Sequence, residues 1–154
     1  MNYLLVCTPE SYEVTRHTGV VGYYDDLVNK CPEFKNAKVG EKIFIYVSKK
    51  KIIEAVGEIT KSYYFDNSMI YGTDKNYVYP HRIGLKFLKE NIGLDFKELI
   101  SRLELIRDKS GRVVYSAYLV RTFIPLSKAD GDLLQVLSGI KDISHAQARD
   151  KAAA

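Results

Sequence analysis

The chain has 154 residues, of which 46% are hydrophobic and 27% charged, and its formal net charge is +4. This composition fits one globular domain with a hydrophobic core, and it excludes disordered and fibrous classes. No apolar run approaches the roughly 18 residues that cross a bilayer, and no basic region precedes the short apolar run at the N-terminus. We therefore expect a cytoplasmic protein with no membrane partner.

The start of the chain predicts a strand followed by a helix. Residues 3–7 are apolar, Thr8 is a candidate N-cap, Pro9 suits the first helical position, and Gly19 is a plausible stop. We expect the next segment, GVVGYYDD at residues 19–26, to be a loop.

Three strands are predicted in the middle of the chain. Residues 42–47 are apolar on both faces, residues 53–62 contain Gly57 where a bulge would curve the sheet, and residues 80–88 alternate. The lysine run between the first two strands is typical of a hairpin tip. Residues 67–76 are polar and contain a glycine, which predicts a loop.

The periodicity becomes helical at about residue 95. Asp95 and Glu98 are placed to cap the start of a helix over residues 95–106. Its apolar residues recur on one helical face, as expected for a helix packed on a core. These residues are Phe96, Leu99, Ile100, Leu103 and Ile106. Residues 113–120 fit either a strand or a short helix.

The end of the chain predicts one more helix. An extended segment ends at Pro125, Ser127 starts the helix, and Gly131 weakens it near its beginning. Its apolar face consists of Leu133, Leu134, Leu137 and Ile140. The pattern then stops, so we expect a single domain over residues 1–143 and a tail over 144–154. The last four residues, KAAA, resemble a cloning scar and carry no functional argument.

The aromatic composition is unusual, with 12 tyrosines and no tryptophan. Tyrosine combines an apolar ring with a hydroxyl that needs a partner, so it favours surfaces and pockets over a dry core. Pro80 pushes Tyr79 towards extended geometry, so the two residues begin a strand. Tyr77, Tyr79 and Arg82 are expected near a rim, where rings and a cation can meet a ligand. The alternative is that these tyrosines close the end of a barrel.

Residues with catalytic or metal-binding chemistry form no recognisable pattern. Cys7 and Cys31 lie far apart, and Cys7 sits in an apolar run where an inert buried thiol is expected. The histidines lack the spacing of a zinc hydrolase, and the hydrolase elbow and the phosphate and dinucleotide loops are missing. Asp25 and Asp26 are adjacent carboxylates, which in a loop are usually solvated. The sequence therefore predicts no metal, no cofactor and no enzymatic activity.

Four segments in order, YEVTRHTGVVGY, KVGEKIFIYV, AVGEITKSYYFD and YPHRIGLKF, resemble the EVE domain family. This is a PUA-like family related to the YTH readers of methylated adenine, and the resemblance covers about residues 3–138. It implies an α+β fold with a small curved sheet or β-barrel flanked by helices, in agreement with the elements above. It also implies a module that binds one modified base of DNA or RNA in a pocket.

A reader of a modified base takes the base out of its stack, which costs a few kcal/mol, and stacking on rings returns about 1–3 kcal/mol per base. In the related families, an aromatic residue after the first helix forms one wall, where this chain has Val21. The resemblance implies that Tyr23 or Tyr24 supplies the ring instead. Val21 and Gly22 would then offer backbone groups at the floor of the pocket.

The resemblance places the second wall at the end of the second central strand. Tyr64 matches the family tyrosine, with Tyr77 or Tyr79 beside it as alternatives, and the Ser62 hydroxyl is available to the base edge. Arg82 matches the arginine of the Tyr-Pro-x-Arg motif, with either a phosphate or a structural carboxylate such as that of Asp66 as its partner.

Basic residues around the rim are candidates for contacts with the phosphate backbone. They are Lys30, Lys35, Lys38, Lys49, Lys50, Lys51 and Arg121. A lysine run at a hairpin tip is also compatible with simple solvation. A salt-dependent affinity would distinguish these two interpretations.

Two classes of function follow. The first is a nucleic-acid binding module, either free-standing or the specificity part of a methyl-directed restriction system whose effector is fused or associated. The second is a small hydrolase of a modified nucleoside, as in the related ASCH domains. The ASCH pattern Gly-x-Lys-x-x-Glu-x-Arg is missing from this chain, which favours the binding module.

Overall fold

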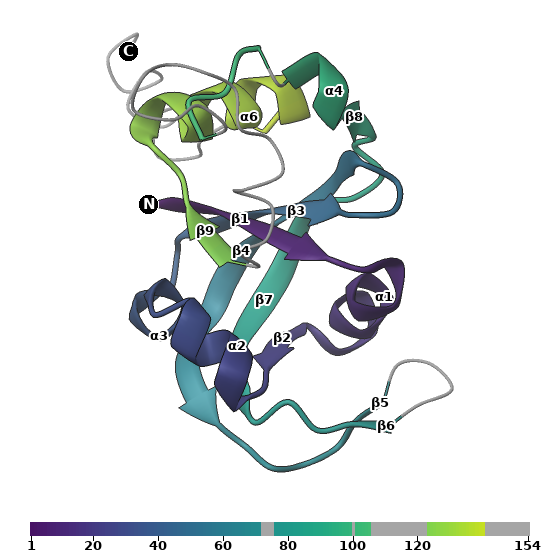
Figure 1. The fold of residues 1–154 in the computed structure, drawn as a ribbon, viewed down its shortest axis with the longest axis vertical. Helices are drawn as coiled ribbons and strands as arrows, with labels where there is room; N and C mark the ends of the chain where they lie inside the picture. Colours follow the sequence, from purple (N-terminus) through teal and green to yellow (C-terminus); the bar gives the residue numbers. More distant parts are fainter. Residues whose placement is uncertain (72–75, 100, 106–122, 141–154) are drawn as a thin grey trace, which may run out of the picture.

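The computed structural model describes residues 1–71, 76–99, 101–105 and 123–140, which form an α+β fold around one mixed sheet (Figure 1). The strands of this sheet are β1 (Asn2–Cys7), β2 (Val20–Tyr23), β3 (Lys42–Val47), β4 (Ile52–Phe65), β7 (His81–Lys89), β8 (Leu94–Asp95) and β9 (Phe123–Pro125). Strands β5 (Ile70–Tyr71) and β6 (Asn76–Tyr77) form a separate hairpin. The helices are α1 (Pro9–Thr18), α2 (Asp25–Lys30), α3 (Glu33–Asn36), α4 (Phe96–Leu99) and α6 (Lys128–Ser138).

The large sheet has the spatial order β2-β7-β4-β3-β1-β9, with β8 paired to the start of β4. Strands β1 and β3 run parallel and the other neighbours antiparallel. The four strands predicted to share one curved sheet are therefore confirmed as neighbours. Because β2 ends the order on one side, its outer edge has no strand partner in the described part of the chain, and this edge becomes important for the site.

Bulges curl the sheet into a half-barrel. The register of β4 against β7 shifts at Gly57 and twice more before Tyr64, and each such irregularity adds local twist. A Cβ atom on Gly57 would lie 2.6 Å from a methyl carbon of Leu85, so glycine allows β4 and β7 to approach closely here. The bulge or bend predicted at Gly57 is thus confirmed as a shift of register against β7.

The caps predicted for the first and last helices are also confirmed. Thr8 accepts a hydrogen bond from the backbone N–H of Ser11, and Gly19 ends α1 with a φ of 68°. Ser127 likewise accepts from the N–H of Asp130 at the start of α6. Gly131, predicted only to weaken α6, is buried and packs against the side chain of Asn2, where a larger residue would collide.

Two predicted loops contain regular structure. The segment 19–26 was expected to be a loop, but Val20–Tyr23 pairs with β7 and Asp25 begins α2. The polar segment 67–76 contributes β5 and the start of β6. At β2 the local glycine and aspartate signals were outweighed by pairing with the distant strand β7, which no local pattern encodes, whereas β5 and β6 pair with each other.

Among the described residues of 95–106, the predicted helix is shorter than expected. Phe96–Leu99 is helical, and turns and a bend follow over residues 101–105. The carboxylate of buried Asp130 explains the difference, because it accepts hydrogen bonds of 2.8 Å from the backbone N–H groups of Glu104 and Leu105, which a longer helix would use internally. Phe96, Leu99 and Leu103 are nevertheless buried, as the periodicity predicted.

The sheet is covered on both faces, as the two-sided apolar pattern of residues 42–47 predicted. One core lies inside the half-barrel, where Phe34 and Phe123 pack edge to face at 5.4 Å. The other lies under α4 and α6, where Phe96 packs on Tyr46 at 4.7 Å. The segment 113–120 and the tail 144–154 lie outside the described residues. None of the helices in the described segments is long and apolar enough to cross a membrane.

Candidate functional site

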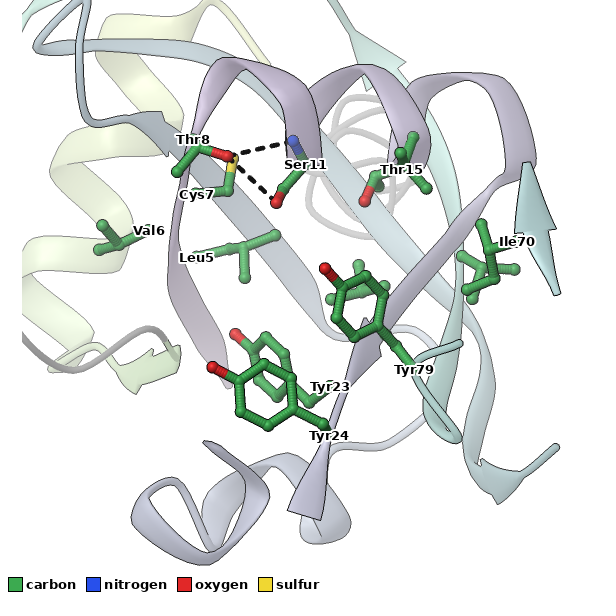
Figure 2. Close-up of a pocket in the computed structure, with 14 residues that line it drawn as sticks. Leu5, Val6, Cys7, Thr8, Ser11, Thr15, Tyr23, Tyr24, Ile70 and Tyr79 are labelled. Atoms are coloured by element: carbon green, nitrogen blue, oxygen red, sulfur yellow. Dashed lines mark hydrogen bonds between the residues drawn. The ribbon is translucent and has the colours of Figure 1, made fainter. Parts of the chain in front are cut away.

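A cavity of about 250 Å³ opens between the edge strand β2, the end of β1 and the inner face of α1 (Figure 2). The segment that joins β4 to β7 adds a further wall with Ile70 and Tyr79. Of the residues predicted to bind a base, those that line this cavity are Val21, Gly22, Tyr23, Tyr24 and Tyr79. The structure thus brings together two segments that lie more than fifty residues apart in the sequence.

Two tyrosine rings stand together at the cavity (Figure 2). The ring centroids of Tyr24 and Tyr79 are 6.0 Å apart and their planes are inclined by 28°. A base held between two rings needs about 3.5 Å on each side, or about 7 Å in total. The two rings therefore form one side of a site, against which a base can stack, and they are too close to act as opposite walls in this arrangement.

Tyr23 differs from its neighbour in burial. Side chains alternate along β2, so Val21 and Tyr23 point into the half-barrel and Gly22 points outward. Tyr23 is buried with its ring 4.6 Å from that of Phe34, whereas Tyr24 is 47% exposed. Of the two rings proposed for the first wall, Tyr24 is thus the accessible one. Val21 reaches the cavity as a buried aliphatic side chain.

Gly22 allows the cavity wall to pack onto β2. A Cβ atom at Gly22 would lie 2.7 Å from the Cβ atom of Tyr79 and 3.3 Å from Cδ1 of Ile70. No side chain fits at that spacing without displacing the segment that carries both residues. The glycine is therefore required for the position of Tyr79.

The backbone of Gly22 also faces away from the sheet. The N–H of Leu85 donates to the carbonyl of Gly19, and in an antiparallel pair only every second residue exchanges such bonds. Val21 consequently belongs to the ladder with Ile83, which corrects the expectation that its backbone is available. Gly22 directs its N–H and C=O towards the open edge of β2, beside the cavity.

The opposite end of the cavity is formed by the start of α1 and is polar but uncharged. Thr8 donates to the hydroxyl of Ser11 at 3.2 Å, and Thr15 lies one turn further along the helix. Burial raises the pKa of the Cys7 thiol to about 12, so the predicted inert thiol is found at the cavity wall. Among the described residues that line the cavity, none has an ionisable carboxylate, imidazole, ammonium or guanidinium group.

Arg82 is buried and holds the segment that carries Tyr79. Its Nε donates to the carbonyl of Tyr79 at 2.8 Å, one Nη donates to the hydroxyl of Ser68 at 2.9 Å, and the other donates to the carbonyl of Ser68. The carboxylate of Asp66 lies 3.5 Å away. Arg82 was predicted to contact either a phosphate or a carboxylate, and the structure supports the carboxylate. Its location in the interior, 3% exposed, corrects its assignment to a phosphate-binding rim.

His81, at the start of β7, links strand β4 to the start of helix α2. Its Nδ1 lies 2.6 Å from the hydroxyl of Tyr63 and its Nε2 lies 2.5 Å from the carboxylate of Asp25. A neutral imidazole that donates from Nε2 and accepts at Nδ1 satisfies both neighbours. Because Asp25 follows Tyr24 and His81 follows Pro80 and Tyr79, this hydrogen bond ties together the segments that carry the two rings.

Other predicted site residues lie outside the cavity. Ser62 is exposed, and Tyr64 is half-buried with the ammonium of Lys61 at 3.9 Å from its ring centroid. Tyr63 faces the interior of the half-barrel and Tyr64 the opposite face of the sheet, and Tyr64 does not line the cavity, so the predicted second wall is not formed by Tyr64. The side chain of Tyr77 lies outside the described residues, as does Arg121.

The lysine run occupies the predicted hairpin tip between β3 and β4. Lys49, Lys50 and Lys51 are exposed there, and none of them lines the cavity. The turn is nevertheless close to the cavity, since the N–H of Ser48 donates to the carbonyl of Cys7 at 2.9 Å. Lys30, Lys35 and Lys38 are exposed around α2 and α3.

The sequence reasoning missed the contribution of α1 and of Ile70 to the cavity. Ser11 and Thr15 lie four residues apart, which places two hydroxyls on one helical face next to buried Val14. That spacing is a usable signal, because small polar residues on an apolar face suggest a wall that does not pack tightly. No comparable signal marks Ile70.

Comparison with known proteins reveals similarity of structure alone. No family model and no curated protein matches the chain. Among solved structures, a hypothetical protein from Leishmania major is 16% identical, covers 90% of this chain and 94% of its own, and has a TM-score of 0.60. The DUF55 domain of human thymocyte nuclear protein 1 is also 16% identical, covers 92% and 100%, and has a TM-score of 0.60. The YTH domain-containing protein mmi1, in a complex with RNA, is 9% identical, covers 88% and 80%, and has a TM-score of 0.55.

At these identities the likeness concerns the fold. The curled mixed sheet with its flanking helices is shared by YTH and DUF55 domains, so the α+β, PUA-like fold implied by the resemblance is confirmed. The chain has the PUA-like fold that YTH and DUF55 domains also adopt.

Proposed function

We propose that this protein is a nucleic-acid binding module that takes one modified base, methylated in our preferred interpretation, into the cavity beside β2. The observation that carries the proposal is an uncharged cavity of about 250 Å³ with two stacked tyrosines and a free strand edge at Gly22. An engineered cavity of about 150 Å³ is enough to hold benzene, so this volume suits a larger flat heterocycle. The RNA complex of a structurally similar YTH domain supports the same class of ligand.

The lining favours a base over other ligands of similar size. A base offers a flat ring for stacking and a polar edge for hydrogen bonds. Tyr24 or Tyr79 provides the ring contact, while Gly22 and the hydroxyls of Ser11 and Thr15 are placed for the edge. A phosphate group would need cations, and the described lining contributes none. The phosphate backbone would therefore stay outside the cavity, where the exposed lysines lie.

Binding is favoured over hydrolysis by the same chemistry. A hydrolase needs a general acid or base within hydrogen-bond reach of the substrate. The described cavity residues offer hydroxyls and a thiol whose pKa is raised to about 12, neither of which exchanges protons readily near neutral pH. A restriction or other effector activity would accordingly come from a fused or associated component.

A panel of short DNA and RNA oligonucleotides, each with one modified base, tests the proposal by fluorescence anisotropy at low salt. The matched variants are Ser11→Trp, which places a bulky ring at the cavity wall, and Ser62→Trp, which places the same ring at an exposed position outside it. We expect a preference for one modified base in the natural protein and in the Ser62 variant, and its loss in the Ser11 variant. No binding of any oligonucleotide, or equal behaviour of the two variants, would contradict the proposal.

A further inference from the structure

A second aromatic surface lies beside the cavity. We define the aromatic rim as Tyr63 and Phe65, whose rings both contact His81 at the open end of the half-barrel. Phe65 is 58% exposed although it belongs to a central strand, and its ring meets that of His81 edge to face at 5.4 Å. Tyr63 stacks on the same imidazole with ring centroids 5.8 Å apart. An exposed apolar patch of this kind, next to a cavity, marks an interaction site.

The register of the sheet fixes the distance from the cavity to Phe65. Tyr23 pairs with His81, and His81 pairs with Phe65, so the three residues form one row across β2, β7 and β4. Neighbouring strands lie about 4.8 Å apart, which puts Phe65 about 10 Å from the cavity strand. Figure 1 shows the end of β4, helix α2 and the end of β2 at the same end of the molecule, away from α4 and α6.

This distance matches the spacing of nucleotides along a strand. Consecutive stacked bases are about 3.4 Å apart, so about 10 Å corresponds to three base steps, and to fewer steps when the strand is stretched. The rim also carries a cation, since the ammonium of Lys35 lies 5.4 Å from the ring centroid of Tyr63. Rings with adjacent cations are the arrangement by which proteins bind single-stranded nucleic acid.

We propose that Phe65 stacks a nucleotide that flanks the base held in the cavity, one to three positions away along a single strand. This inference rests on the proposed function and adds a second contact to it. The hydrogen bond of 2.5 Å between His81 and Asp25 holds the two contacts in a fixed relation, because Asp25 follows Tyr24 and Phe65 rests on His81. The module would then recognise a short stretch of strand around the modified base.

The test compares a probe that fills only the cavity with one that also reaches the rim. The modified base preferred in the oligonucleotide panel is used as a free nucleoside and at the centre of a heptanucleotide. We expect Phe65→Ala to weaken heptanucleotide binding by about 5- to 150-fold, the equivalent of one lost stacking contact, with nucleoside binding unchanged. Phe65→Trp should retain heptanucleotide binding. Val136→Ala, which removes a 75% exposed side chain from α6, should change neither.

Phe65→Leu serves as a second variant, because it keeps an apolar side chain at the strand end and removes only the ring. If both Phe65 variants bind the heptanucleotide as the natural protein does while the nucleoside still binds, the inference is overturned and the proposed function stands. If the natural protein binds neither probe, the inference and the proposed function are both overturned. If sedimentation shows a dimer that Phe65→Ala dissociates, the aromatic rim is a contact between copies of this chain and the inference is also overturned.

Discussion

The two faces of the large sheet are both buried, but they differ in their aromatic residues. The inner face of the half-barrel buries Tyr3, Tyr12 and Tyr23 and partly covers Tyr63, whereas the outer face, under α4 and α6, buries mainly aliphatic side chains with two phenylalanines and a single tyrosine, Tyr46. A buried tyrosine needs a partner for its hydroxyl. The hydroxyl of Tyr3 donates to the carboxylate of Glu41 at 3.0 Å, and the hydroxyl of Tyr63 lies 2.6 Å from Nδ1 of His81. Both hydrogen bonds lie towards the margins of the inner core.

This difference teaches where the molecule can accept a ligand. A face lined by aliphatic side chains packs tightly, because these side chains form no hydrogen bonds with water or with a polar ligand. A face that mixes rings with hydroxyls and a free strand edge offers both stacking and hydrogen bonds. The cavity opens on this inner side, between β2 and α1. Each prediction below tests whether the two faces have separate roles.

The largest expected effects come from removing one buried ring on each face. Phe34 and Phe96 are both fully buried, and replacing either by Ala should lower the free energy of unfolding by about 3–5 kcal/mol. Only Phe34 contacts residues of the open end, with its ring 4.6 Å from Tyr23 and 6.3 Å from Tyr63. Urea denaturation measures the stability of each variant.

The milder pair Phe34→Leu and Phe96→Leu then separates stability from function. Both variants should remain folded, and only the variant at Phe34 should weaken oligonucleotide binding. Equal losses of affinity in the two folded variants would show that the faces do not have separate roles.

The second prediction concerns the buried guanidinium behind the cavity wall. Arg82→Ala leaves the carbonyls of Tyr79 and Ser68 without their charged donor, which should cost about 1.5–3 kcal/mol of stability. Arg82→Lys keeps the charge but cannot form the same fork of hydrogen bonds, so it should fall between the natural protein and Arg82→Ala. Lys86→Ala, an exposed change on the same strand, should stay within about 0.5 kcal/mol. If Arg82→Ala were as stable as Lys86→Ala, the hydrogen bonds of Arg82 to Tyr79 and Ser68 would not stabilise the segment behind the cavity.

The third prediction compares two tyrosines near the ends of β4 and β7. Tyr79 lines the cavity, whereas Tyr64 lies outside it with the ammonium of Lys61 over its ring. Tyr79→Ala should cost about 1–3 kcal/mol of oligonucleotide affinity, as expected for one lost stacking partner, and Tyr64→Ala should cost little. Fluorescence anisotropy titrations with the oligonucleotide measure the affinity of each variant. A larger loss at Tyr64 would place the base beside Tyr64, outside the cavity, and restore the wall that the resemblance implied.

Tyr79 and Tyr64 also show which features of the fold and of the site can be predicted from the sequence. The strands, the caps of α1 and α6 and the bulge at Gly57 were predictable, since each depends on local patterns of hydrophobicity or on a residue with special backbone freedom. The cavity residues of β2 were found because the resemblance pointed to them. The choice of Tyr79 over Tyr64 depended on how the segment before β7 packs onto Gly22 of β2. That contact joins residues more than fifty positions apart, and no local sequence pattern encodes it.

Long-range polar contacts account for the remaining differences. The shortened helix at Phe96 depends on the carboxylate of Asp130, some thirty residues away, and the burial of Arg82 depends on a segment that folds back through Ser68. Each partner is an ordinary polar residue whose role appears only when the chain brings the two together. Sequence patterns report periodicity, and they do not report such pairs.

The fourth prediction concerns the exposed lysines of the β3–β4 turn. Neutralising Lys49, Lys50 and Lys51 together should weaken oligonucleotide binding at low salt without changing which base is preferred, because phosphate contacts position a strand and do not specify it. For a single strand, each lost phosphate contact should reduce the slope of log affinity against log salt by about 0.7. A changed base preference with unchanged affinity would show that the lysines reach the base instead.

The smallest expected effect concerns acid stability at the polar edge of the inner face. Partial burial of Glu41 by itself raises its pKa, but hydrogen bonds from the N–H of Lys38, the amino terminus and Tyr3 outweigh it and lower the pKa from its ordinary value of 4.5. A carboxyl whose pKa is lower in the folded state contributes stability that is complete above the unfolded value and is lost as the pH falls through the folded value. Melting temperatures of the natural protein should therefore decline as the pH falls below the ordinary value of 4.5, and Glu41→Gln should flatten part of this decline. Glu98→Gln, an exposed carboxyl near the outer face, is the matched control, and an equal flattening in both variants would remove any special role of the bond between Tyr3 and Glu41.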